Sequence, residues 1–344
     1  MKIAQIAPLI ERVPPKKYGG TERIVHVLTE ELVKRGHDVT LFASGDSITS
    51  GKLISIYPRG LREARVKDLY AFNELQLYNS GNAYQMQQNF DIIHDHNGYL
   101  SIQTANIASV PSVFTLHGPL NLNQKRMYST FRNPYLVSIS KAQVRTSFDL
   151  NIIDTIYHGL PMEDYPFSDT PEDYLLFVGR ISMDKGLHYA IEVALSVDKP
   201  LIIAAKLDQN DRKYFDDFIE PQLSDDRIRW IGEVNEDERN NLMDKALCVL
   251  HPITFREPFG LTMIEALACG CPVVAFNRGS VPEIIIDGQT GFVVSDIEEM
   301  TEAVARLGEI NRVECRRHAL ENFNSTTMVD KYEAVYKKIL STTK

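Results

Sequence analysis

Several features that mark other classes of protein are scarce or absent. The 344 residues include four cysteines and one tryptophan, and no two cysteines form a Cys-x-x-Cys pair. This excludes a disulfide scaffold, and we expect reduced, mostly buried thiols in a cytosolic protein. No stretch of about 18 apolar residues occurs, so we expect no segment to span a bilayer. The four thiols belong to Cys248, Cys269, Cys271 and Cys315.

An excess of positive charge is also lacking. The chain carries 37 lysines and arginines against 46 aspartates and glutamates, which gives a formal net charge of −9. Proteins that follow nucleic acid need a basic surface, so we predict that nucleic acid is not a partner. The apolar run near the N-terminus ends at Ile10 and is too short for a signal peptide. We predict a cytoplasmic protein and leave contact with the inner face of a membrane open.

Motifs for common cofactors and metals are missing as well. No Gly-x-Gly occurs, so the dinucleotide-binding fingerprint is absent. Segment 45–52 resembles a phosphate-binding loop, but five residues instead of four separate its glycines, and Leu53 replaces the required hydroxyl. No Asp-x-Asp pair occurs, which argues against a metal-bound nucleotide sugar. His94 and His96 share one face of a strand end without a third ligand nearby in the sequence. We therefore predict no metal and no cofactor.

Short apolar runs alternate with amphipathic segments along the chain. In segment 21–35, for example, Ile24, Val27, Leu28 and Leu32 recur at helical spacing, and Gly36 ends the helix. Such alternation is typical of a parallel sheet with helices on both faces. The strands predicted in the first half are 2–9, 37–44, 91–94, 112–116, 135–139 and 154–157.

A proline-rich segment, 160–172, interrupts this pattern, and we interpret it as an interdomain linker. A second α/β series follows, so the sequence predicts two tandem Rossmann-like doubly wound domains with a cleft between them. The first domain covers 1–165 and is completed by a C-terminal helix over about 325–344; the second covers 166–324. The later strands are predicted at 174–178, 201–205, 227–231, 247–251, 273–276 and 291–294, and helices at 187–195, 236–245 and 262–268. The buried face of the last helix is predicted to carry Val329, Tyr332, Val335, Tyr336 and Ile339.

The stretch 179–186 places two cations where a strand ends and a helix begins. Arg180 and Lys185 lie at the carboxyl end of the strand, and Gly186 lets the helix N-terminus approach a ligand. Helix N-termini attract anions, and guanidinium and ammonium groups bind phosphate. The stretch therefore indicates a diphosphate clamp, although two solvated surface charges would give the same pattern.

The stretch 257–265 adds two carboxylates beside a second helix N-terminus. Gly260 precedes a helix predicted to start near Thr262, so free backbone N–H groups point outward. Glu257 lies in the loop and Glu265 about one turn into the helix, so both are placed to face one ligand. A carboxylate accepts two O–H hydrogen bonds at once, which suits vicinal hydroxyls. A phosphate between two polyols describes a sugar nucleotide.

These motifs, in this order, resemble those of the retaining GT-B glycosyltransferases of family GT4, and the resemblance covers nearly the whole chain. The loop 18–22, with Gly19 and Gly20, is similar to the glycine loop of that family. His117 matches the family histidine near the donor sugar; the alternative is a hydrogen-bonded histidine at a strand end. The chain departs from the family at 158–161, before the linker, and at Gly279-Ser280, where the family has paired glycines.

The resemblance implies roles for individual residues. Arg180 and Lys185 would neutralise the diphosphate leaving group, Glu257 would bind hydroxyls of the donor sugar, and Glu265 would bind the ribose. The resulting catalytic set is His117, Arg180, Lys185 and Glu257. The resulting donor-binding set is Gly19, Gly20, Gly232, Val234, Phe259, Gly260, Leu261 and Glu265.

The same resemblance implies the reaction. We expect a metal-independent retaining transferase that moves a hexose-type sugar from a UDP- or GDP-sugar to a hydroxyl of a saccharide, lipid-linked or small-molecule acceptor. The nucleotide sugar is a co-substrate, so no cofactor is required. Two alternatives with the same fold are a nucleotide-sugar epimerase and a non-catalytic nucleotide-sugar-binding protein.

The acceptor side shows a local excess of positive charge. Arg59, Arg62, Arg65 and Lys67 precede a segment with Tyr70, Phe72, Tyr78 and Tyr84. This pattern fits an anionic acceptor or weak peripheral contact with an anionic membrane. A solvated helix face with tyrosines in the core is a further interpretation, and aromatic rings would also stack on a neutral saccharide.

Overall fold

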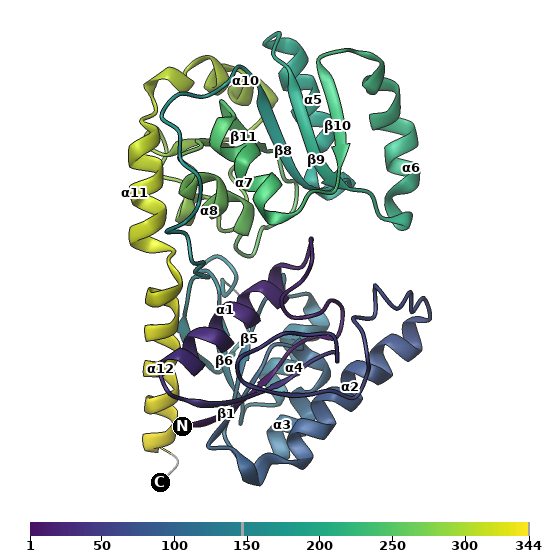
Figure 1. Cartoon of the computed structure of the whole chain (residues 1–344), viewed down its shortest axis with the longest axis vertical. Coiled ribbons are helices and arrows are strands. Elements are labelled where there is room, and N and C mark those ends of the chain that lie inside the picture. Colours follow the sequence, from purple (N-terminus) through teal and green to yellow (C-terminus); the bar gives the residue numbers. More distant parts are fainter. Residues whose placement is uncertain (146–147, 343–344) are drawn as a thin grey trace. The chain divides into compact units, whose positions relative to one another are not determined.

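The computed structural model describes residues 1–145 and 148–342, which form two compact units. Unit 1 consists of Met1–Pro161 and Ser325–Lys344, and unit 2 consists of Met162–Asn324. We placed the boundary after residue 165, whereas the structure divides the chain after Pro161. Each unit is built around one parallel sheet with helices against it (Figure 1). The predicted class of two Rossmann-like domains is confirmed.

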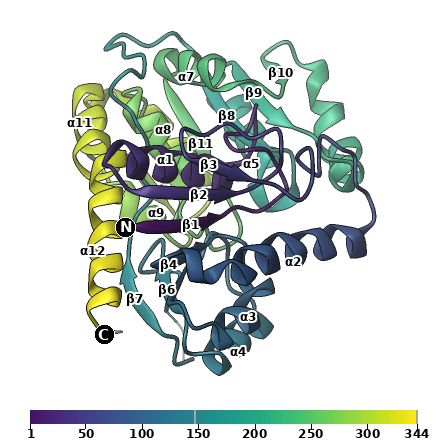
Figure 2. The same ribbon diagram turned by 60° about the horizontal axis from the view of Figure 1, so that its bottom comes forward.

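In the described part of unit 1, seven strands form the sheet in the order β3-β2-β1-β4-β5-β6-β7. Neighbouring strands are parallel, and β1, β2 and β3 lie side by side in Figure 2. The strand order reverses between β1 and β4, which makes this point the natural place for a ligand. The strands are β1 (Lys2–Ile6), β2 (Asp38–Phe42), β3 (Lys52–Ile54), β4 (Ile92–Asp95), β5 (Ser112–Thr115), β6 (Tyr135–Ser138) and β7 (Ile152–Thr155).

The helices of unit 1 follow local signals in the sequence. Helix α1 carries Glu22 in its first turn and Lys34 in its last, charges that suit the helix dipole. Helix α2 starts after Asp68, whose carboxylate accepts a hydrogen bond from the backbone N–H of Tyr70. Our sequence analysis did not assign α2, because its apolar side chains are spread around the helix instead of forming one stripe. The helices are α1 (Gly20–Lys34), α2 (Leu69–Gln85), α3 (Ile102–Ile107), α4 (Leu122–Thr130) and α12 (Ser325–Thr342).

Helix α12 completes unit 1 from the far end of the chain and lies beside α1 (Figure 1). A cluster of ion pairs links the solvent-exposed side of α12 to the rest of unit 1. Arg35 donates to Asp330 at 2.6 Å and to Glu333 at 3.1 Å, and the Nε2 atom of His37 lies 2.5 Å from Glu333. The predicted apolar face is buried, which confirms that part of the sequence analysis: Val329, Tyr332, Val335, Tyr336 and Ile339.

In the described part of unit 2, six parallel strands form the sheet in the order β10-β9-β8-β11-β12-β13. The order reverses between β8 and β11, and these central strands are mostly buried because helices cover both faces. The strands are β8 (Leu175–Arg180), β9 (Leu201–Lys206), β10 (Ile228–Gly232), β11 (Cys248–His251), β12 (Val273–Phe276) and β13 (Gly291–Val294).

The helices of unit 2 include two with strong start signals. Helix α7 begins with a capping box, in which the Asn235 side chain accepts from the Glu238 N–H and the Glu238 side chain accepts from the Asn235 N–H. Helix α10 starts after Asp296, whose side chain accepts from the Glu299 N–H. The helices are α5 (Leu187–Ser196), α6 (Arg212–Tyr214), α7 (Glu236–Lys245), α8 (Leu261–Ala268), α9 (Val281–Ile284), α10 (Ile297–Ala305) and α11 (Arg312–Asn322).

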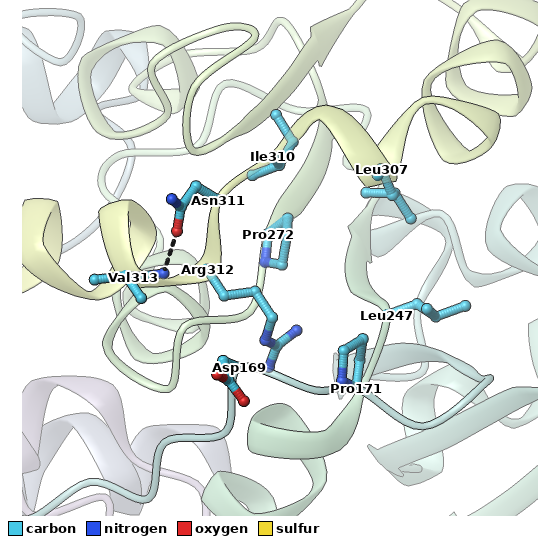
Figure 3. Close-up of a pocket in the computed structure, with 10 residues that line it drawn as sticks. Asp169, Pro171, Leu247, Pro272, Leu307, Ile310, Asn311, Arg312 and Val313 are labelled. Atoms are coloured by element: carbon cyan, nitrogen blue, oxygen red, sulfur yellow. Dashed lines mark hydrogen bonds between the residues drawn. The ribbon is translucent and has the colours of Figure 1, made fainter.

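Arg312, at the start of α11, holds the proline-rich segment to the rest of unit 2. Its buried guanidinium donates to the carbonyls of Ser168 and Ala246, both at 2.8 Å, and to the carbonyl of Asp244 at 2.5 Å. Figure 3 shows Arg312 at a cavity of about 320 Å³ lined by Pro171, Leu247 and other side chains. Because the carbonyls satisfy a charge that would otherwise be costly to bury, we interpret Arg312 as a structural clamp.

Three further expectations can be compared with the fold. The four cysteines are free and buried, as predicted. Segment 45–52 leads into strand β3 instead of a helix, so it lacks the helix N-terminus of a phosphate-binding loop. In the parts of the chain that the structure describes, no helix combines the length and apolar character needed to cross a membrane.

Candidate active site

The predicted donor residues lie at the carboxyl edge of the unit 2 sheet. Arg180 ends β8, Gly232 ends β10, and the loop that contains Glu257 follows β11. Strands β8 and β11 are neighbours at the point where the strand order reverses. In open α/β sheets ligands bind at this edge and at this point. The topology therefore brings the two predicted clamp motifs, which are about 75 residues apart in sequence, to one place.

Arg180 lies between two carboxylates. Its Nη2 atom is 3.4 Å from Asp184 and its Nε atom is 3.6 Å from Asp211, which precedes α6. The Arg180 side chain is 36% exposed, so a ligand has access to it. The two aspartates hold the guanidinium in place without covering it.

Lys185 forms the second charged centre of this edge. Its Nζ atom donates to Glu257 at 2.9 Å and lies 4.8 Å from the centre of the Phe255 ring. Glu257 is 7% exposed, and the Nε2 atom of His251 lies 3.6 Å from the same carboxylate oxygen. The loop after β8 and the loop after β11 are thus joined by a largely buried ion pair.

The ion pair fixes the charge of its members. Burial alone would raise the pKa of Glu257, but the Lys185 ammonium and the His251 ring outweigh burial and lower this pKa to about 2. Burial lowers the pKa of His251, so the ring is neutral at pH 7. Glu257 is consequently an anion at pH 7, able to accept hydrogen bonds from hydroxyl groups.

Three glycines allow the backbone of these loops to approach closely. Gly186 has φ = +70°, and a Cβ atom there would lie 2.1 Å from the carbonyl oxygen of Pro252. Gly260 has φ = +90° and precedes α8, and a Cβ atom there would meet the Met263 side chain at 2.4 Å. A Cβ atom at Gly279 would lie 2.2 Å from the Glu257 carbonyl. Side chains at these positions would push the two loops apart.

The N-terminus of helix α8 lies at this edge. Two side chains that were predicted to belong to the donor site, Glu265 and Phe259, are buried. Glu265 is 2% exposed, and its Oε1 atom lies 3.4 Å from Nη1 of Arg239 on α7. The Phe259 ring is buried against Phe323, with centroids 6.0 Å apart. The buried Phe259 side chain is therefore not exposed to a ligand, and its carbonyl accepts from the Ser280 hydroxyl at 2.7 Å.

Two residues of the predicted donor-binding set, Gly232 and Val234, lie at the end of β10 and just after it. Gly232 has φ = +83°, a conformation that favours glycine, and Val234 directly precedes the capping box of α7. Lys206 lies next to Arg180 in the register of β8 and β9 and forms an ion pair with Asp208 at 2.9 Å. Lys206 is a further cation of this edge that our sequence analysis did not identify.

In unit 1, the glycine loop lies where the strand order reverses. Gly19, with φ = +156°, precedes α1, and a Cβ atom there would lie 2.8 Å from the Pro15 ring. Gly20 is the first residue of α1. Glu22 accepts from the backbone N–H of Glu11 at 3.3 Å, and burial raises its pKa to about 7. This buried carboxyl group holds the loop before α1 in position.

His117 follows β5 and borders a cavity of about 270 Å³ within unit 1. Its Nε2 atom lies 2.8 Å from Nδ1 of His96, and its ring stacks on His158 with centroids 5.2 Å apart. Burial lowers the pKa of His117 to about 3, so the ring is neutral. The predicted role at the donor sugar therefore concerns a neutral imidazole.

The cavity beside Arg312 lies away from the donor residues. Leu247 and Pro272, which line it, precede β11 and β12 (Figure 3). They therefore mark the amino edge of the parallel sheet, opposite to the carboxyl edge that carries Arg180 and Glu257. We assign no role in catalysis to this cavity.

In residues 1–145 and 148–342, no group of three or more His, Cys, Asp or Glu side chains is placed to hold a metal ion. His94 has both ring nitrogens engaged, with Tyr336 at 2.6 Å and Thr115 at 2.7 Å.

Some contacts of the site could not be read from the sequence. Asp211, His251 and Arg239 contact predicted site residues, but each meets its partner through the fold and not through a local motif. One sequence feature could have pointed to His251: it is a lone histidine at the end of an apolar strand. Asp211 and Arg239 lie in strongly charged segments, where nothing separates them from solvent-exposed neighbours.

Two family models match the chain over the ranges that carry these sites. Glycosyltransferase Family 4 matches residues 18–153, and Glycosyl transferases group 1 matches residues 164–323. Every predicted site residue lies within one of these ranges. The chain belongs to the GT4 glycosyltransferases. It is an enzyme of the transferase class, and its GT-B fold agrees with the two parallel sheets described above.

Relatives of this glycosyltransferase include enzymes of carbohydrate synthesis. Glycogen synthase of Mycobacterium tuberculosis is 26% identical over 337 residues, which cover 81% of this chain and 79% of that protein. Sucrose-phosphate synthase from Thermosynechococcus elongatus has a TM-score of 0.82 at 18% identity and covers 99% of this chain and 100% of its own. HepE from Anabaena, solved in complex with UDP and glucose, has a TM-score of 0.76 at 18% identity, and the match covers 98% of this chain and 99% of HepE.

The ion pair between Lys185 and Glu257 predicts a pH-dependent stability of unit 2. The folded pKa of Glu257, about 2, lies below its ordinary value of 4.5. It therefore stabilises the fold above pH 4.5, and this stabilisation is lost as the pH falls toward 2. We expect Glu257→Gln to lower the free energy of unfolding at pH 7 by on the order of 3 kcal/mol. The difference in the free energy of unfolding between Glu257→Gln and wild type should be smaller at pH 3 than at pH 7.

Urea denaturation followed by tryptophan fluorescence measures this, because the single tryptophan, Trp230, lies in unit 2. Glu298→Gln on the exposed side of α10 serves as the control and should stay close to wild type at each pH. A Glu257→Gln difference that is the same at pH 7 and pH 3 would contradict the assigned ion pair.

Proposed function

We propose that the chain transfers a hexose-type sugar from a UDP- or GDP-sugar to a hydroxyl group of an acceptor, with retention of configuration and without a metal. The observation that carries this proposal is the pair of cations, Arg180 and Lys185, at the carboxyl edge of the unit 2 sheet. They lie beside the N-terminus of α8 and the anionic Glu257. The complex of HepE with UDP and glucose supports the same donor class.

The proposed donor site uses cations that are already held by carboxylates. Asp184 and Asp211 orient Arg180, and Glu257 orients Lys185. A bound diphosphate accepts hydrogen bonds from the remaining N–H groups of both side chains, and from the backbone N–H groups at the start of α8. Fixed partners reduce the reorganisation that is needed as charge grows on the leaving phosphate. Glu257 then accepts hydrogen bonds from hydroxyls of the donor sugar, and Glu265 from the ribose.

The proposed reaction exchanges one bond at the anomeric carbon for another. The bond from that carbon to the phosphate oxygen breaks, and the acceptor oxygen forms a bond on the same face. The proton of the acceptor hydroxyl passes to the leaving phosphate, so the products are a glycoside and a nucleoside diphosphate. His117, as a neutral imidazole, contributes a hydrogen bond to the donor sugar. The charge of the leaving group is met by side chains and a helix dipole.

A panel of UDP-, GDP-, ADP- and TDP-sugars tests the donor class. The correct nucleotide, at 100 times its Kd, should stabilise the chain by about 2.7 kcal/mol in a thermal-shift measurement. Arg180→Ala and Lys185→Ala should each reduce kcat by about 100-fold or more, because both cations meet charge that develops in the transition state. Arg306→Ala, a surface change at an exposed ion pair, is the matched control and should leave kcat near wild type.

Unchanged kcat in Arg180→Ala and Lys185→Ala would refute the clamp. A product formed from the nucleotide sugar alone, without any acceptor, would instead indicate an epimerase.

Metal independence gives a separate prediction. Because the side chains supply the positive charge, we expect the enzyme to keep its turnover rate after treatment with EDTA and gel filtration. A parallel sample that receives Mg²⁺ or Mn²⁺ after chelation should show the same rate. A loss of activity on chelation that either ion restores would contradict the proposal.

The cavity of unit 1 supports a neutral acceptor. Its lining, which includes His117, contains no Asp, Glu, Lys or Arg side chain. Three aromatic side chains and three amides line it: Phe72, Tyr99, Tyr128, Gln76, Asn97 and Gln124. Aromatic faces suit the apolar faces of sugar rings, and amides hydrogen-bond hydroxyl groups. We propose that a neutral hydroxyl-bearing ring, such as a saccharide unit, binds here.

The basic run offers less charge to an anionic acceptor than its sequence suggests. Arg62, one of its four cations, is paired with Glu11. The exposed residues of α2 include four apolar or aromatic side chains, together with Glu74 and Gln85: Leu69, Tyr70, Leu77 and Tyr78. With the nearby exposed Arg59, Arg65 and Lys67, these four side chains support peripheral contact with an anionic membrane, which suits a lipid-linked acceptor.

Vesicle sedimentation tests this contact. We expect the chain to sediment with anionic vesicles at low salt, less with neutral ones, and to be released at about 0.5 M salt by screening. The double variant Tyr70→Ser, Tyr78→Ser should sediment less than wild type, whereas Phe167→Ser on exposed unit 2 surface should not differ. Absence of sedimentation at low salt would rule out the contact and leave a soluble acceptor.

A further inference from the structure

A continuous hydrogen-bonded chain runs through the core of unit 1 from His117 to helix α12. His117 is linked to His96 at 2.8 Å, and His96 to Gln5 on β1 at 2.7 Å. Gln5 donates to the hydroxyl of Tyr336 on α12 at 3.3 Å. Apart from His117, which is half-buried, these side chains are almost fully buried. Polar groups at such a depth are costly unless every donor finds an acceptor.

The chain continues beyond Tyr336. The Tyr336 hydroxyl lies 2.6 Å from Nδ1 of His94, and Nε2 of His94 lies 2.7 Å from the Thr115 hydroxyl. Thr115 in turn lies 2.8 Å from the hydroxyl of Tyr332, one helical turn from Tyr336 on α12. Helix α12 therefore contacts this chain at two points, one in its middle and one at its end.

The direction of each hydrogen bond near His117 follows from the chemistry of the groups. The Oε1 atom of Gln5 can only accept, so Nε2 of His96 carries a proton and donates to it. Burial lowers the pKa of His96 well below its usual value, so the ring is neutral and its Nδ1 atom accepts. Nε2 of His117 must then donate to Nδ1 of His96. In neutral His117 this leaves Nδ1 as an acceptor.

The other half of the chain points in the same direction. Tyr336 accepts from Gln5, so its own proton goes to Nδ1 of His94. Burial also keeps His94 neutral by lowering its pKa, so Nε2 of His94 donates to Thr115. In the last link either hydroxyl, that of Thr115 or that of Tyr332, can be the donor. From His96 to His94 each internal member accepts once and donates once, so reversing one bond requires reversing its neighbours.

We infer that Gln5, His96 and Tyr336 are positioning residues that fix the tautomer of His117 with the proton on Nε2 and a free acceptor at Nδ1. This inference rests on the proposed function for its catalytic consequence, because His117 is the proposed contact of the donor sugar. A fixed acceptor at Nδ1 selects a donated hydrogen bond from a hydroxyl. Helix α12 supplies the Tyr336 hydroxyl that accepts from the Gln5 amide, and turning the amide over would require Tyr336 and His94 to reverse their hydrogen bond as well.

The variant Tyr336→Phe tests this assignment with little change of shape. Without the hydroxyl, the Gln5 amide loses the acceptor that fixes its orientation. If the amide turns over, its NH₂ group donates to Nε2 of His96, the proton of His96 moves to Nδ1, and His117 becomes protonated on Nδ1. The variant should therefore contain both tautomers of His117. Tyr332→Phe removes the same atom from the same helix at the far end of the chain and is the matched control.

The readout is ¹⁵N NMR of the histidine rings, which distinguishes the two tautomers, with the His117 signal identified by its absence in His117→Ala. We expect one tautomer in wild type and Tyr332→Phe and a mixture in Tyr336→Phe. The kcat/KM for the donor should fall in Tyr336→Phe by about twofold to tenfold, because only part of the molecules are competent. It should be unchanged in Tyr332→Phe.

Each outcome bears on the inference. An unchanged His117 tautomer in Tyr336→Phe overturns it, and so does a mixture with unchanged kcat/KM, because the tautomer would then be irrelevant to the reaction. If Tyr336→Phe does not fold, Gln5→Met breaks the same link and is judged by the same two measurements. The NMR result does not depend on any donor, so a wrong donor class shows itself separately, as a wild-type enzyme inactive with every nucleotide sugar.

Discussion

In a parallel sheet every strand ends at the same edge, and the chemistry of both units depends on this constraint. The residue that ends β8 and the loop that follows β11 meet because those strands are neighbours at the reversal of strand order. In unit 1 the glycine loop follows β1, at the reversal of strand order, and His117 follows β5, which is separated from β1 by β4. Glycines at these strand ends let the backbone approach where a side chain would collide. The rest of each unit supports one functional edge.

The two edges differ in the charge of their side chains. The proposed donor edge of unit 2 contains many ions, and they form groups of opposite charge such as Lys185 with Glu257 and Arg180 with Asp184 and Asp211. The site around His117 in unit 1 relies on neutral groups, because burial keeps its histidines uncharged and the adjoining cavity lacks charged side chains. These two environments suit the charged leaving group and the neutral hydroxyl of the proposed reaction.

Much of the fold followed from local patterns. The bounds of β12, β13 and α7 match the predicted ranges 273–276, 291–294 and 236–245, because uniform apolar runs and a capping box mark them. Strand β3 was missed because three residues carry too little periodicity, and α2 because its apolar side chains form no stripe. Arg180, Lys185 and Glu257 stood out through their motifs. Their partners Asp211 and His251, and the link from Gln5 to Tyr336, depend on strands and helices that meet only in the folded chain.

Because α12 belongs to unit 1, the two units differ in the order in which synthesis supplies their parts. Unit 2 is one uninterrupted segment, Met162–Asn324, whereas unit 1 combines the beginning of the chain with Ser325 onward. On the ribosome, the residues of unit 2 are therefore all present before those of unit 1 are complete. Until α12 emerges, His94 and Gln5 lack the Tyr336 hydroxyl that joins them. The N-terminal unit, although made first, is the one whose core is closed last.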